Sequence, residues 1–177
     1  MIQVESIRDW APVWSMYETA FPRCERRSWE QHQRALATEA GFSCVQISRS
    51  FQPVALLFYW HLSGDLLFVE HLAVAEHCRG QGVGNAVLQW LQKMGKPIIL
   101  EIEPVVDFVT ERRRRFYRSA GFAELPYEHV QLPYHADTPP VPMRLLSWPG
   151  VLPEQMVMDF EQELRSRVMR YTDAVTV

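Results

Sequence analysis

Apolar residues recur along this chain with two periodicities, one typical of β-strands and the other typical of α-helices. The apolar runs at 42–49, 54–62 and 66–74 are short and bounded by turn residues, which predicts three strands in an antiparallel meander. Weaker runs of the same kind predict further strands at 2–7, 97–104, 127–132 and 142–148.

Helix signals stand before, after and between these runs. Asp9 and Ser28 can cap helix N-termini, and each precedes apolar residues at helical spacing. Gly41 is expected to end the second of these helices. A third helix is expected from Val83 to near Gly95.

Two more helices are expected in the second half of the chain. Thr110 is a candidate cap for the segment that Gly121 ends. The tail after Pro153 has apolar residues at helical spacing, which predicts an amphipathic helix. The face of that helix would carry Val157, Phe160, Leu164 and Val168.

These elements predict an α+β domain, that is a mixed α/β fold in which helices flank a central sheet of about six or seven strands. Without a Pro-, Gly- or Ser-rich linker, we expect one domain over residues 1–150. The amphipathic helix within 151–177 would pack on the same domain or on a partner.

The composition of the chain argues against nucleic-acid-binding, membrane-spanning and secreted proteins. The 177 residues are 47% hydrophobic and 22% charged, and the formal net charge of −3 does not favour binding to nucleic acid. No apolar run is long enough to predict a membrane span, and the N-terminus does not resemble a signal peptide. Three scattered cysteines predict reduced thiols and a cytoplasmic location, and the histidines show no metal-ligand spacing.

The sequence after the third strand of the meander, "CRGQGVGN", is unusual. Gly80, Gly82 and Gly84 stand at alternate positions beside Arg79, at the expected start of a helix. Amide groups at a helix N-terminus attract anions, and glycines let phosphate oxygens approach the backbone. The segment therefore predicts a pyrophosphate site, although a glycine-rich turn without a ligand stays an alternative.

Two common phosphate motifs do not fit this segment. A P-loop requires a lysine after its last glycine, which is absent here, and the dinucleotide fingerprint requires a third glycine where Asn85 stands. That fingerprint also follows the first strand of a βαβ unit, whereas this segment follows a meander.

The segment resembles the acyl-CoA signature of the GNAT-type N-acetyltransferases, [QR]-x-x-G-x-[GA]. Arg79, Gly82 and Gly84 occupy its fixed positions. A second stretch, "RRFYRSAGF", resembles the helix that carries a tyrosine, Tyr117, in that family. The resemblance covers residues 1–148 and implies a mostly antiparallel sheet with a splay between its fourth and fifth strands.

The resemblance also implies a site. Backbone groups of Leu72, Ala73 and Val74 would pair with the pantetheine arm of the coenzyme. Tyr117 would lie close to the coenzyme and protonate the departing thiolate as the general acid. The pyrophosphate would be held by the segment Arg79, Gly80, Gln81, Gly82, Val83, Gly84 and Asn85.

Glu70 is the candidate base. Strand alternation would place Glu70, Leu72 and Val74 on one face, where a carboxylate could bind an amine and accept its proton. A carboxylate satisfied by a neighbouring arginine is the alternative. His71 would face the other way as a hydrogen-bonded core residue.

Two further groups of charged residues each allow more than one role. Glu101 and Glu103 share one face of the next strand, either towards an acceptor cleft or towards solvent. At most two of the arginines at 112–115 can face one ligand, and one of them could reach the coenzyme phosphates.

The function that the resemblance implies is transfer of an acetyl group from acetyl-CoA to a primary amine, by direct attack in a ternary complex and without a metal. A non-catalytic acyl-CoA-binding or regulatory protein and a nucleotide-binding protein are the alternatives. The acceptor amine is not specified by the sequence, nor is the choice between a monomer and a homodimer.

Overall fold

A computed structural model describes residues 2–174. Within this range, eight strands form one sheet in the order β1-β2-β3-β4-β5-β8-β6, with β7 also paired to β8. All neighbours are antiparallel except β4 and β5. The strands are β1 Gln3–Ser6, β2 Phe42–Arg49, β3 Gln52–His61, β4 Leu67–Val74, β5 Ile98–Ile102, β6 Ala123–Glu124, β7 His129–Gln131 and β8 Val141–Trp148.

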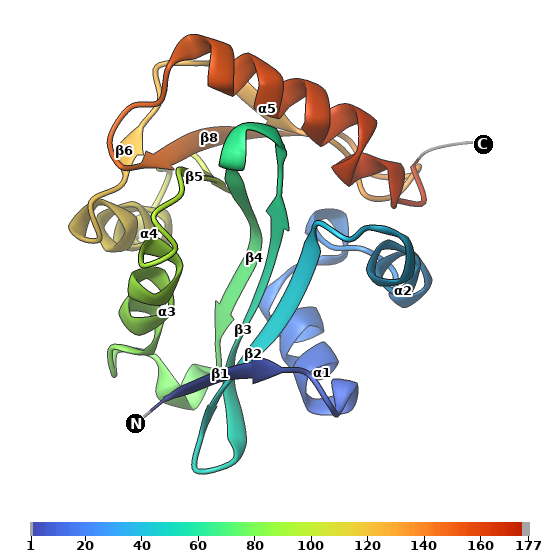
Figure 1. The fold of residues 1–177 in the computed structure, drawn as a ribbon, viewed down its shortest axis with the longest axis vertical. Helices are drawn as coiled ribbons and strands as arrows, with labels where there is room; N and C mark the ends of the chain where they lie inside the picture. The colour runs from blue at the N-terminus through green and yellow to red at the C-terminus, as the bar shows by residue number, and fades with distance from the viewer. Residues whose placement is uncertain (1, 175–177) are drawn as a thin grey trace.

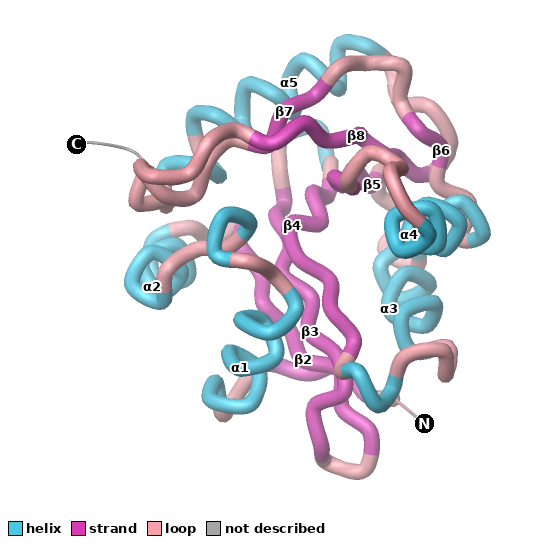
Figure 2. The backbone as a smooth tube through the Cα atoms, turned by 180° about the vertical axis from the view of Figure 1, so that it is seen from behind, coloured by secondary structure: helices cyan, strands magenta, loops and turns pink. Residues whose placement is uncertain are grey.

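The helices divide between the two faces of this sheet. Figure 1 shows α1 and α2 on one side of β2, β3 and β4, with α3 and α4 on the other side, and Figure 2 shows the same layers from behind. The helix α5 runs along β7 and β8 (Figure 2). Their bounds are α1 Trp10–Ala20, α2 Trp29–Thr38, α3 Val83–Gln92, α4 Phe108–Ser119 and α5 Glu154–Ser166.

The expected splay lies between β4 and β5. Their parallel pairing joins Leu67–Val69 to Ile98–Leu100 and stops there. On its other side, β4 pairs with β3 as far as Val74. Beyond Val69, β4 therefore keeps one neighbour and leaves its other edge open to a ligand.

A β-bulge interrupts β4 at Glu70. Tyr59 of β3 pairs with Val69, whereas the preceding residue, Phe58, pairs with His71, so Glu70 is the additional residue. A bulge of this kind shifts the alternation of side chains along the strand. The prediction that Glu70 shares a face with Leu72 and Val74 was therefore wrong.

Glu70 and His71 both point towards the side of α1. Glu70 bonds Trp60 and His71 approaches Tyr17, and both partners belong to the core beneath α1 and α5. Leu72 and Val74 instead pack against the core beneath α3 and α4. The expectation that His71 faces away from Glu70 fails for the same reason.

Two helix ends differ from their predictions. The cap of α4 is Asp107, whose carboxylate accepts from the backbone N–H of Thr110 at 2.8 Å, while the Thr110 hydroxyl completes a capping box. The helix α2 ends at Thr38, before Gly41. At Gly41, a Cβ would come within 2.7 Å of the carbonyl oxygen of His61, so close packing explains this glycine.

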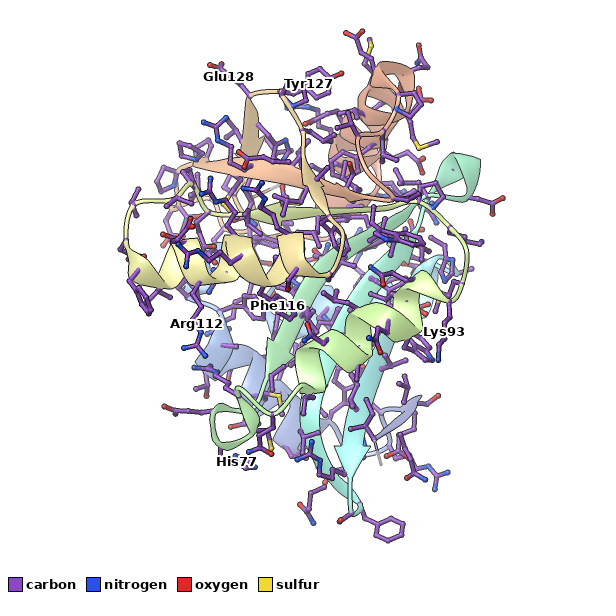
Figure 3. The ribbon with its side chains drawn as sticks, turned by 90° about the vertical axis from the view of Figure 1, so that its left-hand side faces the viewer. His77, Lys93, Arg112, Phe116, Tyr127 and Glu128 are labelled. Carbon is purple, nitrogen blue, oxygen red and sulfur yellow. The ribbon has the colours of Figure 1, made fainter. Side chains whose placement is uncertain are left out.

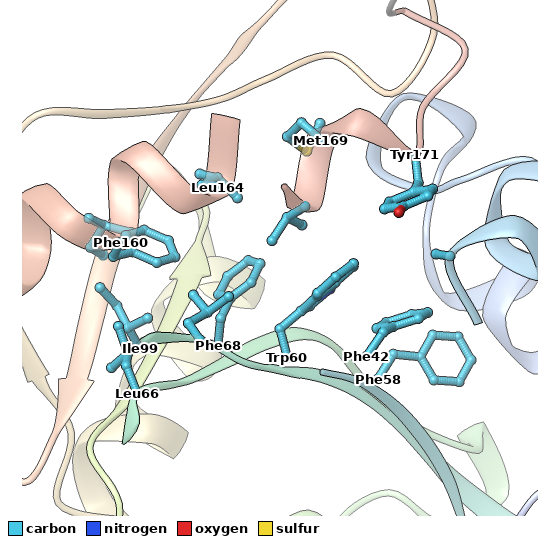
Figure 4. Close-up of a cluster of buried hydrophobic side chains, with 14 of the residues drawn as sticks. Phe42, Phe58, Trp60, Leu66, Phe68, Ile99, Phe160, Leu164, Met169 and Tyr171 are labelled. Atoms are coloured by element: carbon cyan, nitrogen blue, oxygen red, sulfur yellow. The ribbon is translucent and has the colours of Figure 1, made fainter. Parts of the chain in front are cut away.

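The C-terminal helix buries its apolar face on the sheet of the same chain. Phe160 packs against Phe68 of β4 with ring centroids 5.1 Å apart, and Leu164 lies in the same cluster (Figure 4). Val168, expected on the same helix, lies in a following 3₁₀ turn, Val168–Arg170, and is also buried. Because α5 covers β4 and β5, its side chains come close to the splay.

Candidate active site

The glycine segment forms the loop that leads into α3. Gly80 and Gly82 have φ values of 75° and 78°, and Gly82 is the N-cap of the helix. This backbone region disfavours side chains. A Cβ at either position would meet no protein atom within 4 Å, so the space beside both glycines is open to a ligand.

Gly84 is required for a different reason. It lies in the first turn of α3, where a Cβ would come within 2.9 Å of Cζ of Phe116. The missing side chain therefore lets α3 approach α4. Sequence reasoning assigned one task to all three glycines, whereas the structure divides them between an open loop and a helix contact.

A cleft of about 400 Å³ lies between this loop and α4. Its walls include Gly80, Gly82, Asn85 and, from α4, Arg112 and Phe116. In Figure 3, Arg112 and Phe116 lie on the side of α4 that faces the loop carrying His77. Loop amides, a helix N-terminus and an arginine form a suitable environment for a pyrophosphate.

The other predicted loop residues occupy different places. Arg79 and Val83 line the same cleft. The side chain of Gln81 is engaged elsewhere, because it accepts from Arg49 at 2.7 Å and donates to the carbonyl of His77 at 2.8 Å. Only the backbone of Gln81 is therefore available for the predicted contact.

A second cleft, of about 170 Å³, follows the splay. Leu72, Ala73 and Val74 line it along the free edge of β4. Val74, Arg79 and Arg113 belong to the walls of both clefts, so the cleft at the glycine loop adjoins the cleft at the splay. We call the first the coenzyme cleft and the second the acceptor cleft.

Tyr117 of α4 lines the acceptor cleft and is 8% exposed. Burial raises the pKa of its phenol to about 12, with Arg113 acting in the opposite direction and Glu103 in the same direction as burial. The phenol is therefore protonated at neutral pH and can donate a proton or a hydrogen bond.

Glu70 is the centre of a buried polar network. The guanidinium of Arg27 donates to Oε1, and neither side chain is more than 1% exposed. Tyr134 donates to the same oxygen and Trp60 to Oε2, both at 2.8 Å. Burial alone would raise the pKa of Glu70, but Arg27, His71 and the hydrogen bond from Trp60 hold it well below its usual value.

His71 and Glu25 also line the acceptor cleft. Burial lowers the pKa of His71 to about 4, so the ring is neutral. Its Nε2 donates to the carbonyl of Glu25 at 2.8 Å, which leaves Nδ1 as an acceptor. Burial, together with Glu103, raises the pKa of the Glu25 carboxyl.

Glu101 of β5 and Glu103, which directly follows that strand, both line the acceptor cleft. Glu103 forms an ion pair with Arg113 of α4. Glu101, with a side chain only 7% exposed, accepts from Nε2 of His129. The Nδ1 of His129 donates in turn to Glu161 of α5 at 2.5 Å.

Several residues of this site were missed by sequence reasoning. Arg27, Tyr134 and Gln131 stand far along the chain from the residues they approach, and no local motif marks them. His129 and Glu161 belong to a predicted strand and a predicted helix whose contact could not be foreseen. An arginine beside Glu70 was considered, but its identity required the fold.

Residues 2–174 show neither a metal-ligand cluster nor a membrane-spanning helix. That range contains no group of three or more His, Cys, Asp or Glu side chains placed to hold a metal ion. None of its helices has the length and apolar character needed to cross a bilayer.

The family model of the acetyltransferase (GNAT) domain matches residues 34–124, which is more than half of the chain. The chain belongs to the GNAT acetyltransferase family. The fold agrees with this assignment, because a solved structure described as a GNAT protein matches it over nearly the whole chain.

Individual relatives support the GNAT assignment. The "Putative acetyltransferase YjbC" of Bacillus subtilis (strain 168) is 32% identical over 112 residues, which cover 62% of this chain and 58% of that protein. The match therefore spans less than two thirds of the relative.

Solved GNAT structures cover more of the chain. A "Putative acetyltransferase from GNAT family" of Bacteroides thetaiotaomicron is 26% identical, covers 99% of both chains and has a TM-score of 0.83. Naa50 of Arabidopsis thaliana, in complex with the bisubstrate analogue CoA-Ac-MVNAL, is 16% identical with a TM-score of 0.59, over 82% of this chain and 97% of its own. The Naa50 similarity is one of fold.

Proposed function

We propose that this protein is an N-acetyltransferase that moves an acetyl group from acetyl-CoA to a primary amine. The amine would attack the thioester directly while both substrates are bound. The family assignment supports acetyl transfer, and the CoA portion of the analogue bound by the Naa50 relative supports the coenzyme.

The observation that carries this proposal is that the two clefts adjoin. Val74, Arg79 and Arg113 border both the open glycine loop and the splay. A diphosphate at Gly80 and Gly82 would therefore lead its pantetheine arm along the free edge of β4. The thioester would then arrive beside Tyr117, opposite the carboxylates of the acceptor cleft.

The protein would position the two substrates, polarise the thioester carbonyl with backbone N–H groups and supply a proton from Tyr117. Unpaired backbone N–H groups of β4 would polarise the thioester carbonyl. As the amine nitrogen bonds to the carbonyl carbon and the C–S bond breaks, Tyr117 would give its proton to the departing sulfur. The acceptor, which arrives as an ammonium, would lose one proton to a carboxylate of the cleft or to water before it attacks. After the attack its nitrogen would lose a second proton, and a proton would return through water to the Tyr117 phenolate.

The base assignment to Glu70 stays a prediction, and its surroundings suggest a second task. Both carboxylate oxygens accept hydrogen bonds from buried donors. Its pKa is also held low, so it is a weak proton acceptor. We therefore propose that Glu70 fixes Arg27 and the floor of the cleft, and that another carboxylate meets the amine.

The proposal is tested by thiol release from acetyl-CoA across a panel of primary amines. Tyr117→Phe should lower kcat by about 100-fold or more, because the phenol proton is lost, while the Kd for acetyl-CoA is kept. The matched control is Tyr59→Phe, which removes a phenol that is also buried under α3 but borders neither cleft.

Two results would contradict this proposal. Thiol release with none of the amines, despite coenzyme binding, would favour a non-catalytic acyl-CoA-binding protein. Tight binding of ATP or NAD without binding of acetyl-CoA would favour a nucleotide-binding protein.

A further inference from the structure

The acceptor cleft contains buried hydrogen-bond acceptors that lack a donor. The amide oxygen Oε1 of Gln131 has no hydrogen-bond partner among the described residues, although Gln131 is only 8% exposed and lines the cleft. The Nδ1 of His71, in the same cleft, is likewise buried without a partner. A buried polar atom without a partner is costly, so these atoms indicate a ligand that donates.

Glu101 supplies a third hydrogen-bond acceptor in the same cleft. Its Oε1 accepts from His129, while Oε2 lies 3.5 Å from the amide nitrogen of Gln131, beyond a strong hydrogen bond. Glu101 and Gln131 both line the cleft. A primary ammonium has three N–H donors and no acceptor, and therefore suits this lining.

His129 connects Glu101 to the C-terminal helix. His129 and Gln131 stand at alternate positions of β7 and therefore share one face. The ring of His129 bridges Glu101 of β5 and Glu161 of α5, and its own side chain is 1% exposed. Glu161 is 29% exposed and lies 3.9 Å from Arg165 at the surface.

The charge state of this bridge follows from its neighbours. Burial alone would lower the pKa of His129, but Glu101 and Glu161 outweigh burial and raise it to about 9. Both ring nitrogens are then donors at neutral pH. The ring fixes one oxygen of Glu101 and leaves the other for a ligand, with a net charge of −1 for the three groups.

We propose that Glu101 is the carboxylate that binds the reacting ammonium of the acceptor, and that His129 and Glu161 are positioning residues that hold it. This inference rests on the proposed function. The acceptor would be an amine that carries no carboxylate, because Glu25 borders the same cleft and the group of Glu101, His129 and Glu161 has a net negative charge, so that an anion would be repelled. The C-terminal helix would thereby take part in acceptor recognition through Glu161.

The test uses amines that share one reacting group and one five-carbon chain. Cadaverine, hexylamine and 6-aminohexanoate end in an ammonium, a methyl group and a carboxylate. With wild-type protein and acetyl-CoA, we expect the highest kcat/KM for cadaverine and the lowest for 6-aminohexanoate. A preference for 6-aminohexanoate would overturn the proposed acceptor class.

Three variants separate binding from positioning. Glu101→Gln should lower kcat/KM for cadaverine by ~10- to 100-fold, the effect of losing a hydrogen bond to a charged group, with the Kd for CoA unchanged. Glu161→Gln should have a smaller effect at neutral pH. It should also move the alkaline limb of the kcat/KM profile to lower pH, because His129 loses one of the carboxylates that keep it charged.

Rescue and control complete the design. His129→Lys, which restores a cation beside Glu101, should recover more activity than His129→Ala. Asp159→Asn removes an exposed carboxylate of α5 that bonds Gln155, and should leave kcat/KM unchanged. Wild-type kinetics in Glu101→Gln, or an unshifted alkaline limb in Glu161→Gln, would overturn the assignment of that residue.

Failure of the proposed function is recognised separately. If the wild-type protein releases no thiol with any amine, calorimetric titration of cadaverine into the CoA complex tests whether Glu101 binds the ammonium. Heat that is present in wild type and lost in Glu101→Gln would support the ammonium site in a protein without transfer activity. The same heat in both proteins, or none in either, would overturn it.

Discussion

Arg27 and Glu70 form an ion pair in which neither side chain is more than 1% exposed. Arg27 precedes α2 and Glu70 stands at the bulge of β4, so the pair joins two elements that are 43 residues apart in sequence. Arg27 also donates to the carbonyls of Tyr171 and Val168, both at 2.8 Å. One guanidinium thereby connects the N-terminal helices, the sheet and the C-terminal segment.

Removal of this guanidinium should strongly destabilise the protein. Arg27→Met leaves Glu70 buried without its cation, and breaking a buried pair in this way costs about 3–5 kcal/mol of unfolding free energy. Urea denaturation measures the loss. Arg118→Met, at an exposed position of α4, is the control.

A second substitution tests whether the cost comes from the unpaired charge. Arg27→Met combined with Glu70→Leu should be more stable than Arg27→Met alone, because no charge is then left buried. Equal stability of the single and double variants would contradict this explanation.

The three glycines should give different phenotypes. Gly82→Ala places a methyl group in the coenzyme cleft at a φ of 78° and should weaken CoA binding in calorimetry. The matched control is Gly95→Ala, which has a φ of 69° and equally open space but borders neither cleft. Both should lose about 1–2 kcal/mol of stability from the left-handed backbone, and only Gly82→Ala should lose affinity.

Gly84→Ala should act on the helix contact instead. Its methyl group would clash with Cζ of Phe116, which requires α3 or α4 to move. Overpacking of this kind costs ~1–3 kcal/mol of unfolding free energy. Phe116→Leu should restore part of this stability in the double variant, and an unchanged melting curve for Gly84→Ala would contradict the contact.

Arg112 should contribute to coenzyme affinity through charge. It lines the coenzyme cleft, and Arg112→Ala should raise the Kd for CoA by about 10-fold, with less salt dependence than wild type. Arg115→Ala is the control, because Arg115 on the same helix is 76% exposed and pairs with Glu111. Equal effects of the two substitutions would exclude a specific phosphate contact.

The His129 bridge predicts an alkaline loss of stability. The folded-state pKa is raised to about 9, from an unfolded value near 6.5. The bridge therefore contributes fully below about pH 6.5, and its contribution disappears as the pH rises through about 9, up to ~3 kcal/mol in total. Urea denaturation across this range should show the decline in wild type and a flatter profile in His129→Gln.

The glycine loop and Tyr117 could be singled out as a candidate coenzyme site because their sequence signals are local. Arg79, Gly82 and Gly84 belong to one short contiguous segment. Tyr117 belongs to a second short motif, "RRFYRSAGF", in a predicted helix. The splay came from the family resemblance and is confirmed by the pairing of β4 with β5. Most strands were predicted, but β6 has only two residues and is too short to show an alternation of apolar and polar side chains.

The acceptor half could not be predicted in the same way. The bulge at Glu70 reverses the alternation of β4, and no residue type marks such an insertion. The bridge of Glu101, His129 and Glu161 joins groups that are 28 and 32 residues apart. These contacts depend on how β5, β7 and α5 pack, which follows from the whole core.

The range of the family match has a consequence for how this protein could diverge. Residues 34–124 contain the glycine loop and Tyr117, whereas Phe21, Glu25, Gln131 and Met143, which complete the acceptor cleft, lie outside that range. The proposed coenzyme site therefore lies within the matched stretch, whereas part of the wall of the acceptor cleft lies outside it. If the proposed function holds, substitutions in the flanking stretches would alter the choice of acceptor and leave the residues proposed to bind the coenzyme unchanged.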